Sequence, residues 1–137
     1  MRFVVDCSVV MSWCFDDESD NYADKVLELV TKNEALVPSI WPLEVANVLL
    51  VGERKKRLTK ADSTRFIELL SAQPIVVDME TQEKALGDTL SLARDYGLSS
   101  YDASYLELAM RHGIALATSD QSLRKAAEKC GIRLLKA

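Results

Sequence analysis

Short apolar runs alternate with longer amphipathic stretches along the whole chain. The runs that have the length and composition of buried strands cover residues 2–6, 35–38, 75–78 and 114–118. Between them, apolar residues recur at the spacing of a helix face. Strands that alternate with helices predict a parallel sheet covered on both faces. The pattern therefore predicts an α/β fold.

Helix start and stop signals divide the intervening stretches. The predicted helices cover residues 9–15, 22–30, 42–57, 60–72, 81–96, 99–111 and 120–129. Pro42 suits the first position of a helix, and Gly97 and Gly113 suit positions just past a helix end. Residues 132–135 add a short final strand, so we expect four to five strands. No linker, repeat or low-complexity tract interrupts residues 1–137, and a single domain is predicted.

Four acidic residues stand at junctions between a strand or loop and a helix: Asp6, Glu44, Asp102 and Asp120. Each alone is explained by helix capping or by the helix dipole. In an open α/β sheet, however, such junctions meet at one edge, where ligands bind. Carboxylates that converge repel one another and must bind cations or protons. Magnesium or manganese, which prefer oxygen ligands, would meet that need.

The segments around these acids resemble a known family. They are Asp6-Cys7-Ser8, Glu44 with Asn47, Tyr101-Asp102-Ala103-Ser104-Tyr105, and Thr118-Ser119-Asp120. In this order they look like the PIN-domain ribonucleases, especially the VapC-type toxins of bacterial and archaeal toxin–antitoxin pairs. The resemblance spans nearly the whole chain and implies a PIN-like fold.

The resemblance also implies a mechanism and partners. Asp6, Glu44, Asp102 and Asp120 would hold one or two Mg²⁺ or Mn²⁺ ions and position water for in-line attack on an RNA phosphodiester. Supporting roles, or local capping bonds, fall to three further residues: Ser8, Asn47 and Thr118. The family pattern further implies a homodimer and inhibition by a cognate antitoxin. The competing hypothesis is an inactive PIN-like module that binds RNA or a protein while its acids cap helices.

Charge and composition add two expectations. The formal net charge is −4, but a local basic stretch contains Arg54, Lys55, Lys56 and Arg57. This stretch is either a solvated helix end or a contact for RNA phosphates or an acidic partner. The N-terminal apolar run is too short for a signal peptide or a membrane span, so a cytoplasmic protein without a membrane partner is expected.

Other chemistries fit the sequence less well. The lone histidine, His112, lies in the last turn of a predicted helix and suits the helix dipole better than a catalytic triad. Asp78 ends the third strand as a receiver phosphoacceptor would, but Lys136 is followed only by one residue. The acidic turn of residues 16–20 lacks the glycine and closing glutamate of a calcium loop. Aromatic residues that could stack on RNA are Trp13, Trp41, Tyr101 and Tyr105, although helical spacing favours core positions.

Overall fold

Four parallel strands form one sheet in the computed structural model, which describes residues 1–15, 17 and 20–137. The strands are β1 (Arg2–Val5), β2 (Glu34–Pro38), β3 (Ile75–Asp78) and β4 (Ala115–Ala117), in the order β3-β2-β1-β4. Phe3, Val4 and Val5 are all fully buried. Because successive strand residues face opposite sides, both faces of β1 are covered. The predicted α/β architecture is confirmed.

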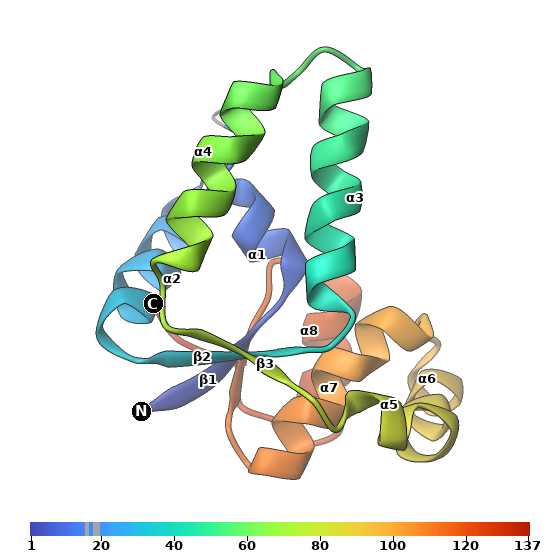
Figure 1. Cartoon of the computed structure of the whole chain (residues 1–137). Coiled ribbons are helices and arrows are strands. Elements are labelled where there is room, and N and C mark those ends of the chain that lie inside the picture. Colours follow the sequence, from blue (N-terminus) through green and yellow to red (C-terminus); the bar gives the residue numbers. More distant parts are fainter. Residues whose placement is uncertain (16, 18–19) are drawn as a thin grey trace.

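Helices surround this sheet. They are α1 (Cys7–Ser12), α2 (Asn21–Lys32), α3 (Trp41–Arg54), α4 (Lys60–Ser71), α5 (Thr81–Lys84), α6 (Leu90–Tyr96), α7 (Ser100–His112) and α8 (Gln121–Lys129). Figure 1 shows α3 and α4 rising on one side of the sheet, with α5, α6 and α7 on the other. The Ser63 hydroxyl of α4 donates to Glu53 of α3 at 2.6 Å. Helix α7 contacts β1, β2 and β4.

Two predicted elements differ from the structure. Residues 132–135 do not form a full strand, because their pairing with β4 is limited to a bridge between Leu134 and Leu116. The predicted continuous helix 81–96 is interrupted by a π-helix, η2 (Ala85–Thr89). Gly87, which has low helix propensity, lies inside this wider turn.

The acidic turn of residues 16–20 lies partly outside the described residues, which leave out 16, 18 and 19. Of the rest, Asp20 caps α2 by accepting the Ala23 N–H at 2.6 Å. Among the described helices, none combines the length and apolarity that a bilayer crossing requires.

The strand order creates a crevice at one edge of the sheet. β2 and β3 follow β1 on one side, whereas β4 lies on its other side. Connections from the carboxyl ends of β1 and β4 therefore diverge, and ligands bind at such a switch point in open α/β sheets. The Asp6 N–H continues the pairing by donating to Ala117 O at 3.0 Å. Asp6 and the segment after β4 are thus adjacent.

Candidate active site

Three hydrogen bonds fix Asp6 at the end of β1. Its Oδ1 accepts the Ser8 hydroxyl at 2.6 Å and the Val9 N–H at 3.2 Å, which makes Asp6 the N-cap of α1. Its Oδ2 accepts the hydroxyl of Thr118, a fully buried residue after β4. Asp6 itself is 4% exposed. A carboxylate has about four acceptor sites, so these bonds orient Asp6 and leave room for one more ligand.

Thr118 links Asp120 to the same corner. Its Oγ1 accepts the Asp120 backbone N–H at 3.0 Å while its hydroxyl hydrogen goes to Asp6. Asp120 is the N-cap of α8, and its Oδ1 accepts the N–H groups of Ser122 and Leu123 at 2.8 and 3.2 Å. One threonine therefore joins the Asp6 carboxylate to the backbone of Asp120, although the two residues are remote in the sequence.

Glu44 and Asp102 come from the first turns of α3 and α7. The hydroxyl of Tyr105, a side chain only 1% exposed, donates to Glu44 Oε1. Tyr105 lies three residues after Asp102, so one face of α7 presents both residues. Ser99 caps α7 by accepting the Asp102 N–H at 3.1 Å. The Asp102 carboxylate is therefore not the cap of its own helix.

The four predicted carboxylates line one cavity of about 700 Å³, called the acid cavity below. Other residues on its wall include Cys7, Ser8, Arg57, Tyr105 and Ser119. The sequence placed these acids at separate junctions, and the structure brings all four together. Their chemical role stays a prediction.

Burial and mutual repulsion raise the pKa values of these acids. Burial raises the pKa of Asp6, and the charge of Asp102 adds to it. Burial also raises the pKa of Glu44; the Tyr105 hydrogen bond opposes this, and Asp102 and Asp6 reinforce it. At Asp102, burial acts first and the charge of Asp120 second. Burial, Glu44 and Asp6 raise the pKa of the neighbouring Cys7 thiol to about 12. The cavity is therefore an environment that disfavours negative charge unless a cation enters.

The donor set fits a hard divalent cation. Within the described residues, no three His, Cys, Asp or Glu side chains stand close enough to form a ready-made metal site. Mg²⁺ keeps several of its waters, so it needs few direct protein ligands. Carboxylate oxygens on the wall of a cavity of about 700 Å³ leave space for those waters. The residues present therefore suit Mg²⁺ or Mn²⁺.

Of the three residues predicted to support the acids, two contact them and one lies elsewhere. Ser8 and Thr118 both donate to Asp6. Asn47 is exposed and does not line the acid cavity, where Val48 lies instead. On a helix, a residue four positions after Glu44 shares its face more closely than a residue three positions after it.

One of the four basic residues of the stretch 54–57 lines the acid cavity, and the other three do not. Arg54 ends α3, and Lys55 and Lys56 follow it on the exposed surface. Arg57 alone of the predicted four lines the acid cavity. The sequence indicated Arg57 as a possible phosphate contact but did not place it beside the acids. It also did not indicate the bond from Tyr105 to Glu44. The signal for the latter was available, because a buried tyrosine hydroxyl normally needs a partner.

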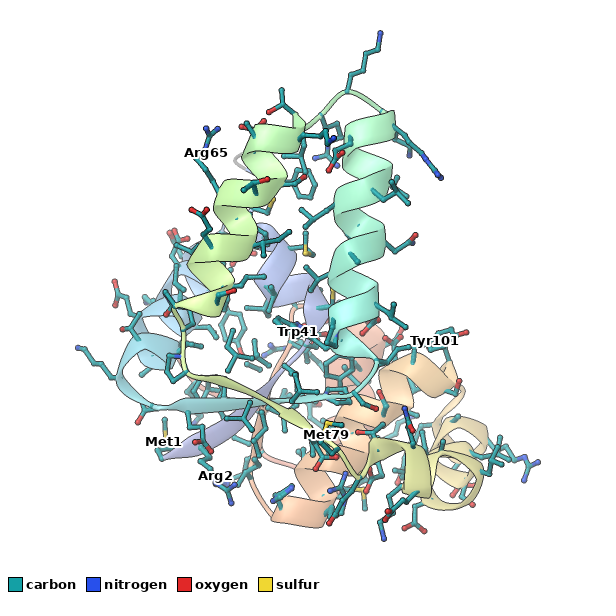
Figure 2. The ribbon with its side chains drawn as sticks, in the orientation of Figure 1. Met1, Arg2, Trp41, Arg65, Met79 and Tyr101 are labelled. Carbon is teal, nitrogen blue, oxygen red and sulfur yellow. The ribbon has the colours of Figure 1, made fainter. Side chains whose placement is uncertain are left out.

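Residues considered for other roles in the sequence analysis have structural contacts or lie away from the acid cavity. Asp78 is bound by Arg111, which donates to its two oxygens at 3.0 and 2.8 Å, and Lys136 is exposed at the C-terminus. Trp13 donates to Ala23 O at 2.8 Å, and Trp41 is 8% exposed. Figure 2 shows Trp41 turned inward at the start of α3 and Tyr101 projecting outward from α7.

Comparison with known proteins agrees with this architecture. The family model of the PIN domain matches residues 3–129. The chain belongs to the PIN domain family. A curated relative, Ribonuclease VapC3 of Pyrobaculum aerophilum, is 27% identical over 123 residues, which cover 90% of this chain and 92% of the relative.

Two solved structures share the PIN fold. PAE2754 from Pyrobaculum aerophilum matches with a TM-score of 0.66 and 26% identity, covering 92% of this chain and 79% of that one. VapBC2 from Rickettsia felis, solved bound to a promoter DNA fragment, matches with a TM-score of 0.68 and 13% identity over 98% of both chains. This chain is therefore similar to VapC proteins along nearly its whole length.

Proposed function

We propose that this PIN-domain protein is a Mg²⁺-dependent endoribonuclease that hydrolyses RNA phosphodiester bonds, and that it acts as a VapC-type toxin. The observation that supports the proposal is the convergence of Asp6, Glu44, Asp102 and Asp120 on one cavity at the switch point of the sheet. The similarity to Ribonuclease VapC3 supports RNA as the substrate. A cytoplasmic location, one domain over residues 1–137, a homodimer and a cognate antitoxin are parts of the same proposal.

The chain's own residues have distinct tasks in this mechanism. Asp6, Glu44, Asp102 and Asp120 would hold the cation. When bound, the divalent ion would polarise the phosphodiester and lower the pKa of the attacking water. Ser8 and Thr118 keep the Asp6 carboxylate in one orientation, and Tyr105 does the same for Glu44. Such fixed orientation reduces the reorganisation needed during the reaction.

Proton competition gives the proposed activity a definite pH dependence. Cation binding requires ionised carboxylates. The pKa values of Asp6, Glu44 and Asp102 are raised in the folded protein, so protons compete with the cation at higher pH than at free carboxylates. Cleavage should therefore decline on acidification, and a higher Mg²⁺ concentration should restore it.

An inactive binding module remains the second candidate because two of the acids do cap helices. Asp6 caps α1 and Asp120 caps α8. Replacing Asp6 or Asp120 would therefore change the stability of the fold and the proposed cation binding at the same time. Asp102 and Glu44 separate the two hypotheses, because neither side chain serves as an N-cap.

The test is cleavage of single-stranded RNA by the purified protein with Mg²⁺, against chelator, Asp102→Asn and Glu44→Gln. Glutamine keeps an oxygen for the Tyr105 hydroxyl, and asparagine keeps the backbone bond to Ser99. We expect Mg²⁺-dependent cleavage that falls at least a hundredfold in both variants while their melting curves stay cooperative. Full cleavage in chelator, or in both variants, would remove the metal mechanism. RNA binding without any cleavage would favour the binding module.

A further inference from the structure

Arg57 connects the acid cavity with a second cavity. Among the residues that the structure describes, it is the only lysine or arginine on the acid cavity wall. It also lines a neighbouring cavity of about 650 Å³, called the flanking cavity below, whose wall includes Phe66 and Arg65 of α4. Phe15 and Arg57 belong to both walls. The two cavities therefore adjoin at this pair of side chains.

A tight turn after α3 fixes the backbone of Arg57. Lys56 has φ 61°, in the left-handed region that favours glycine. The Lys56 N–H donates to Glu53 O at 3.0 Å and the Arg57 N–H donates to Gly52 O at 2.8 Å. These two bonds form a Schellman motif, which reverses the chain at a helix end. Arg57 is therefore directed back toward the body of the protein instead of continuing along α3.

Phe15 fixes the side chain of Arg57. The guanidinium carbon lies 4.2 Å from the centroid of the Phe15 ring, within the range of a cation–π contact. A Cβ added at Gly52 would meet Phe15 Cζ at 3.3 Å and Leu58 Cδ1 at 3.0 Å. Glycine at this position lets α3 approach the ring that supports the guanidinium. The platform under Arg57 is thus part of the packed structure.

Asp17, which with Asp62 also lines the flanking cavity, pairs with the guanidinium. Arg57 Nη2 lies 3.0 and 3.1 Å from the two Asp17 oxygens. The side chains are 40% and 74% exposed, so this ion pair contributes little stability and exchanges readily with another anion. A phosphate oxygen is such an anion, and arginine binds phosphate through a planar set of donors.

A positive charge beside the acid cavity would offset the repulsion between its carboxylates and an RNA backbone. Four carboxylates repel the polyanionic backbone that the proposed reaction brings to them. We propose that Arg57 is a phosphate-positioning residue, which binds the phosphate next to the scissile one and directs the adjoining nucleotide into the flanking cavity. The inference rests on the proposed ribonuclease function and assigns a residue and a second cavity to substrate placement.

Single-turnover cleavage of a short single-stranded RNA tests the inference, with the half-saturating protein concentration and the maximal rate measured at several salt concentrations. The variants are Arg57→Gln, Arg57→Lys, Asp17→Asn and Arg94→Gln. Arg94 is an exposed residue of α6 that lies on neither cavity, and it matches the charge change.

For Arg57→Gln we expect the half-saturating concentration to rise about tenfold, the maximal rate to change less than about threefold, and the salt slope to fall by about 0.7, as for one lost phosphate contact on a single strand. Lysine should restore part of the affinity. Arg94→Gln should leave the half-saturating concentration within about twofold. Asp17→Asn removes an anion that competes with phosphate for the guanidinium, so it should not raise the half-saturating concentration.

Several outcomes would overturn the inference. If Asp17→Asn impairs binding as much as Arg57→Gln, the ion pair is structural. If Arg57→Gln matches Arg94→Gln, Arg57 does not touch RNA. If Arg57→Gln weakens capture of the antitoxin and leaves RNA kinetics unchanged, the junction serves a protein partner. In these three cases the wild-type protein still cleaves RNA. If it does not, the proposed function fails and the inference fails with it.

Discussion

Removing one carboxylate from the acid cavity should stabilise the metal-free protein. Asp102→Asn is the most suitable change, because Asp102 is only half-buried and the cap of α7 is made by its backbone N–H, which donates to Ser99 and is kept by asparagine. Asparagine has nearly the same shape. The substitution therefore removes a charge with little change in packing. That charge is one that adds to burial in raising the pKa values of Asp6 and Glu44.

The magnitude follows from the separation of the charges. The four carboxylates share the wall of one cavity of about 700 Å³, and we take a separation of roughly 8 Å between two of the charges. At that separation two unit charges interact by about 0.5–2 kcal/mol for effective dielectric constants between 80 and 20. Solvent screens the half-exposed Asp102, so we expect a gain of about 1 kcal/mol. For a chain of this length, that gain raises Tm by about 4 °C.

The pH dependence has a definite sign. A raised carboxyl pKa means that the folded state holds its proton more tightly than the unfolded state does. Stability is then lost as pH rises from the unfolded value of 3.8 through the raised pKa of Asp102. The advantage of Asp102→Asn should therefore be full at neutral pH and vanish below pH 3.8, where the carboxyl is protonated in both states.

The assay is thermal and urea unfolding in chelator at neutral and acidic pH, with Glu28→Gln as a control. Glu28 is exposed on α2, away from the acid cavity, and its replacement gives the same change in net charge. Adding Mg²⁺ should raise the Tm of the wild type more than that of Asp102→Asn, because a ligand that binds only the folded state stabilises it. A less stable Asp102→Asn protein in chelator, or an equal gain in the Glu28→Gln control, would show that repulsion at Asp102 does not destabilise the fold.

Three further predictions concern positions outside the carboxylates. Lys56→Gly should stabilise the protein by about 1 kcal/mol, because glycine adopts the left-handed φ of 61° without strain, and a melting curve measures this. Arg111→Ala should cost about 3–5 kcal/mol at neutral pH in urea unfolding, because it leaves the carboxylates of Asp78 and Glu107, 10% and 4% exposed, without their partner. Arg111 lowers the pKa of Asp78, so that pair stabilises the fold above pH 3.8, and the difference between variant and wild type should shrink as pH falls below it. In chelator at pH 8, Cys7 should react with iodoacetamide roughly thirty- to sixtyfold more slowly than a thiol of pKa 9. Its pKa is raised to about 12, and the smaller thiolate fraction is partly offset by the greater nucleophilicity of that thiolate; peptide mass spectrometry measures the labelling.

Each of these predictions has its own contradicting outcome. An unchanged or lower Tm for Lys56→Gly would mean that the lysine side chain stabilises the turn. A cost below about 1 kcal/mol for Arg111→Ala would show that the two carboxylates regain solvation. Rapid labelling of Cys7 in chelator would show that the acid cavity does not suppress its thiolate.

Periodicity and junction chemistry predicted most of the fold. The four strands and the helices between them follow from apolar spacing, because parallel strands need buried runs and their crossovers need amphipathic helices. The last predicted strand became a single bridge between Leu134 and Leu116, because a short apolar run predicts a buried position without fixing how far its pairing extends. The π-helix at residues 85–89 was not predictable from apolar spacing, because its wider turn depends on tertiary packing.

The site shows a similar division. The convergence of Asp6, Glu44, Asp102 and Asp120 follows from their positions at strand and helix ends. Asn47 lies outside the acid cavity because its spacing from Glu44 fits a helix turn but not the direction of the cavity, and its supporting role stays a prediction. The contacts of Tyr105 and Arg57 join segments far apart in the sequence. Such contacts depend on how helices pack, which local patterns do not encode.

Anomalous diffraction from crystals containing Mn²⁺ would show whether the acid cavity binds a divalent cation. We expect a manganese peak inside the acid cavity, bound directly by at least one of its four carboxylates and through water by others. These carboxylates belong to Asp6, Glu44, Asp102 and Asp120. The same crystals of Asp102→Asn should show a weaker peak or none. A manganese peak only elsewhere on the protein, or an acid cavity without manganese at saturating concentration, would exclude the proposed metal site.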